Sequence, residues 1–181
     1  RDAKRLPPPR GNGLWTQEIY YHLLNTGLRV PPSAGSASGV LPNPVGYNRV
    51  YSHLGKEMSY PKWWEGLRAG RSFVTNGPLL LCTANGKLPG EVFTAKTGGR
   101  VEVALDCELI SNDNVPALEI IKNGEVAARL KLKDGRKARA EGTVVFERSG
   151  WFLVRAVTDN RETFRFASTA PWYVESDASA R

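Results

Sequence analysis

Five polar residues in two short stretches are the best candidates for a binding site: Tyr47, Asn48 and Arg49 in the first, and Thr75 and Asn76 in the second. An arginine holds an anionic group through a forked pair of hydrogen bonds, and threonine and asparagine add neutral donors and acceptors. A structural role competes with this hypothesis. The second stretch continues into a Gly-Pro turn, and the arginine could instead pair with an acid such as Glu65.

Other catalytic chemistry has little support in the sequence. A catalytic metal needs at least three converging His, Asp, Glu or Cys ligands, but His22 and His53 each lack a second histidine at helical or strand spacing. Cys82 and Cys107 do not form a C-x-x-C pair, so they do not indicate structural zinc. The glycines of residues 35–39 lack the lysine of a phosphate-binding loop, and no G-x-S-x-G motif occurs. We therefore expect no catalytic residue and no metal ligand in this chain.

Two adjacent tryptophans, Trp63 and Trp64, could stack on a sugar or a base, or they could pack a helix against the rest of the protein. Tyr60, Trp63 and Leu67 recur at the spacing of a buried helical stripe. We favour the structural role, in which this helix supports the junction between two parts of the chain.

The elements that position these residues change character along the chain. In the first part, Thr16 and Gly27 are typical of a helix start and stop, with Ile19, Tyr20, Leu23 and Leu24 on one face. Residues 28–32 should be extended, because each proline restricts the residue before it. Residues 47–54 alternate like a strand. A second helix should begin after Ser59 and end at Gly70.

From residue 72 onward the hydrophobic period falls to two, which is typical of strands. Seven or eight strands over about 100 residues match an immunoglobulin-like sandwich in number and spacing. Asn123-Gly124 predicts a tight hairpin, and Asp134-Gly135 predicts a second one. The fold class expected is mainly β (α+β), with a small helical N-terminal segment packed on an antiparallel immunoglobulin-like β-sandwich. The expected domains are residues 1–71 and 72–181.

The net charge of +7 is concentrated in residues 1–10 and 122–139. No aromatic residue interrupts the second basic stretch to stack on bases, so nucleic acid is an unfavoured partner. The apolar runs are too short to cross a bilayer, and no apolar segment follows the basic start as in a signal peptide. Localisation is therefore left open. Export would be favoured if a longer precursor carries a signal, and the two cysteines could then bridge neighbouring strands; otherwise they are free and buried.

Several segments in order, RSFVTNGPL at 71–79 above all, resemble the C-terminal half of the CehA/McbA-like metallohydrolases. These are bacterial relatives of the polymerase-and-histidinol-phosphatase (PHP) superfamily. The other segments are residues 21–39, 44–51, 63–70, 85–90 and 166–174. In that family a metal-binding barrel precedes a β-sandwich. The resemblance implies that residues 1–71 hold the last barrel elements, with a final barrel strand near 28–33, and that the two candidate stretches face one cleft at the junction.

The sequence departs from the family at two positions. Ala37 stands where an aspartate near the metal is expected, and Ser168 stands where a histidine is expected. The resemblance therefore implies no cofactor in this chain. A divalent metal is expected only if the upstream barrel, the implied partner in the same polypeptide, is present.

Two functional hypotheses follow. The chain is either the C-terminal scaffold of a PHP-like metal-dependent hydrolase, not catalytic alone, or a non-catalytic module that binds a carbohydrate, a polyanion or a protein. A small anionic or sugar ligand is the expected partner of Arg49.

Overall fold

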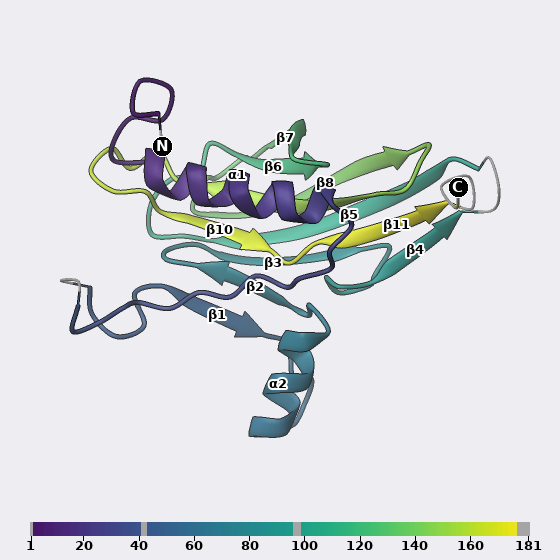
Figure 1. Ribbon diagram of the computed structural model, residues 1–181, viewed down its shortest axis with the longest axis horizontal. Coiled ribbons are helices and arrows are strands. Elements are labelled where there is room, and N and C mark those ends of the chain that lie inside the picture. Colours follow the sequence, from purple (N-terminus) through teal and green to yellow (C-terminus); the bar gives the residue numbers. More distant parts are fainter. Residues whose placement is uncertain (1, 41–42, 96–98, 177–181) are drawn as a thin grey trace.

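The computed structural model describes residues 2–40, 43–95 and 99–176, which form two helices and eleven strands (Figure 1). The elements in chain order are α1 Gly11–Asn25, β1 Arg49–Ser52, α2 Tyr60–Arg68, β2 Ser72–Thr75, β3 Leu79–Ala84, β4 Val92–Ala95, β5 Val101–Ile110, β6 Ala117–Lys122, β7 Glu125–Lys131, β8 Lys137–Phe146, β9 Gly150–Val157, β10 Phe166–Thr169 and β11 Trp172–Ser176.

The strands form two packed sheets of unequal size. The larger has eight strands, and the smaller has three in the order β3-β5-β8. In the larger sheet β9 pairs with β6 along one side, while β10 and β11 lie end to end along its other side. β2 and β1 continue the sheet from β10, and β4 joins β11 as its parallel partner. The predicted fold class, a mainly β immunoglobulin-like sandwich with mostly antiparallel strands and a small helical N-terminal segment, is confirmed.

The main core lies between the sheets, where inward side chains alternate along each strand. Trp172 is fully buried and stacks on Phe152, with ring centroids 5.2 Å apart. On the other face of the larger sheet, α1 covers Trp151 and Leu153 with Tyr21 and Leu24. The larger sheet is therefore covered on both faces near β9.

Polar contacts fix α1 on this face. Arg155 of β9 donates a hydrogen bond to Gln17 of α1 over 2.7 Å and pairs with Glu119 over 2.6 Å. The indole of Trp151 donates to the Asn25 side chain, 2.8 Å away. These bonds hold a helix that shows little segregation of apolar residues in its sequence.

The predicted start of α1 is wrong, and its predicted face is right at two of its four residues. The helix begins at Gly11, and Thr16 lies inside it, where its hydroxyl donates to the Asn12 carbonyl. Leu24 is buried and Tyr20 packs against the same cluster, as predicted, whereas Ile19 and Leu23 are exposed and Tyr21 is buried in their place. The stop at Gly27 is confirmed, because this residue has a φ of 89° and its amide bonds to Leu24.

α2 has the predicted cap but not the predicted packing. Ser59 accepts a hydrogen bond from the Lys62 amide and Pro61 lies in the first turn. Within the helix only Gly66 is buried, and Tyr60 is 72% exposed. The tryptophans pack on each other at 5.0 Å, and α2 projects away from the sheets (Figure 1). The stripe predicted to be buried is therefore only partly covered, with Trp63 and Leu67 half-buried and Tyr60 exposed.

One of the two predicted hairpins is confirmed, and three further expectations differ from the structure. Asn123-Gly124 makes the predicted hairpin, with both residues at positive φ between β6 and β7. Asp134-Gly135 does not, because β7 belongs to the larger sheet and β8 pairs with β5 in the smaller one. Residues 28–33 form no strand, and β2–β11 are ten strands where the alternation predicted seven or eight.

Candidate functional site

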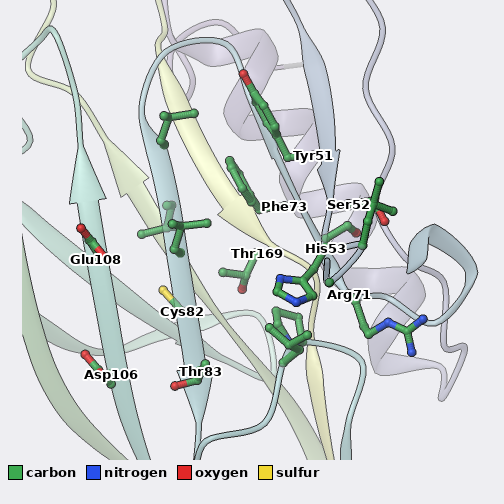
Figure 2. A pocket seen from close by; sticks show the side chains of 18 of the residues that line it. Tyr51, Ser52, His53, Arg71, Phe73, Cys82, Thr83, Asp106, Glu108 and Thr169 are labelled. Atoms are coloured by element: carbon green, nitrogen blue, oxygen red, sulfur yellow. The ribbon is translucent and has the colours of Figure 1, made fainter. Parts of the chain in front are cut away.

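A hollow lies where the larger sheet extends beyond the smaller one. β3 is the edge of the smaller sheet and packs across β10 and β2, so β1 lies beyond it without an opposing strand. A groove of about 720 Å³ runs between the β3 edge and the inner face of β1 and β2 (Figure 2). This volume is within the range of small-molecule sites.

The first wall of the groove is aromatic. Tyr51 and Phe73 are cross-strand partners on β1 and β2, and their rings stack 5.0 Å apart. Thr169 follows on β10, opposite Phe73. Phe73 is buried, whereas Tyr51 is 41% exposed because no strand of the smaller sheet covers β1.

The second wall is β3, which contributes five consecutive residues from Leu79 to Thr83. Leu80 and Cys82 point to the core, while Leu81 points outward and is 55% exposed. Ile110 of β5 lies opposite Leu79 and extends this apolar surface. A strand with leucine on both faces is unusual at an edge, where charged residues commonly prevent unwanted pairing.

Charged and polar groups surround the apolar centre. At one end the His53 amide donates to the Arg71 carbonyl, and the Arg71 guanidinium pairs with Glu65 at 2.7 Å. Figure 2 shows the His53 ring near Thr169 on this side. On the β5 side lie Asp106 and Glu108.

These rim charges are unequally matched. Glu108 lies 3.7 Å from Arg139, whereas Asp106 has no ion-pair partner among residues 2–40, 43–95 and 99–176. The β5 rim therefore carries an unbalanced negative charge.

The five polar residues chosen from the sequence do not line this groove. Thr75 and Asn76 instead join the end of β2 to the start of β10. The Thr75 hydroxyl lies 2.6 Å from the Pro78 carbonyl and accepts a bond from the Gly77 amide. The Asn76 side chain bonds the backbone at Phe164 and Phe166, each over 2.8 Å.

Tyr47, Asn48 and Arg49 have local partners as well. The Asn48 amide donates to the hydroxyl of Ser36, and the Tyr47 hydroxyl lies 3.3 Å from that of Thr163. Arg49 donates to the Gly46 carbonyl over 2.8 Å and to the Tyr51 hydroxyl over 3.2 Å. Arg49 does not pair with Glu65, whose partner is Arg71. The structure thus gives each of these residues a structural contact.

The described residues contain no group of three or more His, Cys, Asp or Glu arranged to hold a metal ion. His22 lies in α1 and His53 at the groove, and neither Ala37 nor Ser168 lines the groove. Within the same residues, no helix is long and apolar enough to cross a membrane.

The groove was not predicted from the sequence, although one signal for it was present. Three consecutive leucines, Leu79 to Leu81, put apolar side chains on both faces of one strand. Such a strand is expected to be covered on both faces, and here the outer face of β3 is open.

No protein-family model matches the chain, and no curated protein matches it. Two solved structures have a weak likeness in shape to this chain. The solution structure of the CARDB domain of PF1109 from Pyrococcus furiosus has 15% identity, a TM-score of 0.33, and coverage of 54% of this chain and 95% of that one. The crystal structure of the same domain in complex with di-metal ions has 16% identity, a TM-score of 0.33, and coverage of 56% and 96%.

Proposed function

We propose that this chain is a non-catalytic binding module whose groove accepts an extended peptide segment of a protein partner. The segment adds to the free edge of β3 as a fourth strand of the smaller sheet and lies over Tyr51 and Phe73. Strand addition of this kind draws affinity from main-chain hydrogen bonds and specificity from pockets for alternate side chains.

The observation that carries the proposal is the direction in which each residue of β3 points its backbone amide and carbonyl. The Asn85 amide donates to the Ala104 carbonyl, so Asn85, Thr83, Leu81 and Leu79 direct their backbone groups toward β5. The residues between them direct their backbone amides and carbonyls to the opposite, free edge of β3. The backbone amide and carbonyl of Ala84 bond to Lys87, but the backbone groups of Leu80 and Cys82 have no partner among the described residues.

These unpaired groups lie in an apolar setting. Leu80 is 1% exposed and Cys82 6%, and both side chains point into the core. A buried backbone group without a partner costs free energy comparable to a lost hydrogen bond. An added strand would satisfy them and cover Leu81 and Tyr51 at the same time.

The rim specifies the partner further. An added strand directs alternate side chains inward onto Phe73 and Tyr51, where apolar residues fit. Its outward side chains share a face with Asp106 and Glu108, whose charge favours lysine or arginine. The expected ligand is therefore an extended segment that alternates apolar and polar residues and carries a basic side chain.

The experiment is selection of heptapeptides from a random displayed library on the full chain, followed by titration of synthetic peptides. We expect enriched sequences to alternate apolar and polar residues. Leu81→Lys, at a position 55% exposed beside the groove, should weaken their binding by at least about tenfold.

The matched control is Leu23→Lys on α1, at a position 45% exposed and away from the groove, which should leave binding unchanged. Equal losses in both variants, or binding of soluble sugars or phosphate at the groove in place of peptides, would refute the proposal.

The hydrolase-scaffold hypothesis stays a prediction based on the resemblance alone. Its test is the open reading frame upstream of this segment. A His-x-His motif there would support an enzyme, and its absence would favour the module.

A further inference from the structure

The two cysteines of the chain lie directly opposite each other in the smaller sheet. Cys82 of β3 and Cys107 of β5 are register partners, and both side chains point into the core. Cys82 is 6% exposed, Cys107 is fully buried, and both are free thiols.

In an antiparallel pair of strands, hydrogen-bonded and non-hydrogen-bonded residue pairs alternate, and the kind of pair sets the distance between the two Cα atoms. Because Asn85 and Ala104 form a hydrogen-bonded pair, every second pair along β3 and β5 is hydrogen-bonded, and the cysteine pair is not. The pairing of β5 with β8 gives the same result. The Ser111 amide donates to the Arg136 carbonyl, so Cys107, four residues before Ser111, also directs its backbone groups toward β8 and away from Cys82. Opposite residues at a non-hydrogen-bonded site have Cα atoms about 4.5 Å apart, the closer of the two spacings.

This spacing suits a covalent bridge. A disulfide spans Cα separations of roughly 4.4–6.8 Å, so the pair requires no strand to move apart or change register. We infer that Cys82 and Cys107 are a cross-strand disulfide site, oxidised when the chain folds in the presence of a low-molecular-weight disulfide such as oxidised glutathione.

The exchange balances as two thiol–disulfide steps. The Cys82 thiolate attacks one sulfur of the small disulfide, which forms a mixed disulfide and releases one small thiol. The Cys107 thiolate then attacks the Cys82 sulfur and releases the second small thiol. The protein loses two electrons and two protons, and the small disulfide is reduced to two thiols.

The folded environment explains when the bridge forms. Burial raises the pKa of the Cys82 thiol well above its ordinary value, so little thiolate is present in the folded protein. Only the Cys82 side reaches the groove, and Cys107 is closed off from solvent. Oxidation is therefore fast during folding, before the core closes, and slow afterwards. Reduction of the completed bridge is slow for the same reason.

The bridge would fix the edge strand that forms one wall of the groove. It closes the segment 83–106 into a loop, which restricts the unfolded chain. A loop of this size should raise the melting temperature by roughly 5–15 °C relative to the reduced protein.

The experiment starts from the full chain, reduced and unfolded in guanidinium chloride, and refolds it with a mixture of oxidised and reduced glutathione. We expect the intact mass to fall by about 2 Da, free thiols to disappear, and non-reducing peptide mapping to join the Cys82 and Cys107 peptides. Dithiothreitol added to the unfolded product should restore both thiols.

Cys82→Ala and Cys107→Ala are the controls, and neither should show the rise in melting temperature under oxidising conditions. Two free thiols per chain after oxidative refolding would overturn the inference. So would a bridged protein that melts no higher than the reduced one, or a chain that refolds only under reducing conditions.

Discussion

The centre of the sandwich and the extension formed by β1, β2 and α2 use similar aromatic residues for different purposes. At the centre Trp172 is fully buried against Phe152, and both faces of the larger sheet are covered. In the extension Trp64 is 38% exposed, and Tyr51 is exposed above an open groove. The difference comes from the number of strands in each sheet, because three strands cannot cover the full width of the larger sheet.

The largest expected effect is at the centre. Trp172→Ala removes a fully buried indole that stacks on Phe152 and donates to the Lys87 carbonyl. We expect the free energy of unfolding to fall by about 3–5 kcal/mol. Chemical denaturation would measure it, and a loss below that of Trp63→Ala would reverse the assignment of core and extension.

A close contact connects the two regions and gives the next largest effect. A Cβ atom on Gly90 would lie 1.8 Å from the Ala69 carbonyl oxygen at the end of α2. Gly90→Ala should therefore destabilise the protein by about 3 kcal/mol.

Gly39→Ala is the matched control for Gly90→Ala. Gly39 has the same φ of 90° with no atom within 4 Å, so only the backbone penalty of about 1 kcal/mol applies. Equal losses in the two variants would show that the contact with α2 does not matter.

Trp63→Ala should have a modest effect. The indole is half-buried and contacts its neighbour Trp64 instead of the main core. We expect a loss of about 1 kcal/mol, well below the value for a core tryptophan. A thermal melt decides the point: a loss as large as that of Trp172→Ala would mean that α2 supports the sandwich after all.

The smallest effect concerns the candidate anion site. The Arg49 guanidinium donates hydrogen bonds to the Gly46 and Tyr47 carbonyls. Arg49→Ala should cost about 1 kcal/mol of stability through these bonds. It should leave the response to phosphate and acidic sugars unchanged in a calorimetric titration. A loss of anion binding with an unchanged melting temperature would restore Arg49 as a ligand residue.

The sequence predicted those features that depend on a few neighbouring residues. Asn123-Gly124 forms its hairpin because both residues adopt positive φ, and Ser59 caps α2 through a bond within one turn. Asp134-Gly135 has similar turn chemistry, but its flanking strands lie in different sheets. That outcome depends on pairing with β5 and β6, which local residue types do not encode.

The candidate site was missed for the same kind of reason. Polar residue types led to Thr75 and Asn76, which bond the backbone between β2 and β10. The groove instead depends on strand order, since it exists because the smaller sheet ends at β3 and has no strand opposite β1. The face of α1 was predicted only in part, because Ile19 and Leu23 form an apolar stripe beside the buried residues Tyr21 and Leu24.

The edge of β3 is proposed here as an open strand position, and amide hydrogen exchange at single residues tests this proposal most directly. In the free protein the amides of Leu80 and Cys82 should exchange faster than those of Leu81 and Thr83, which bond to β5. Saturation with a peptide selected on the full chain should slow exchange at Leu80 and Cys82 by at least about tenfold and leave Leu81 and Thr83 unchanged. If a bound peptide leaves the Leu80 and Cys82 amides as exchangeable as before, strand addition at β3 is wrong.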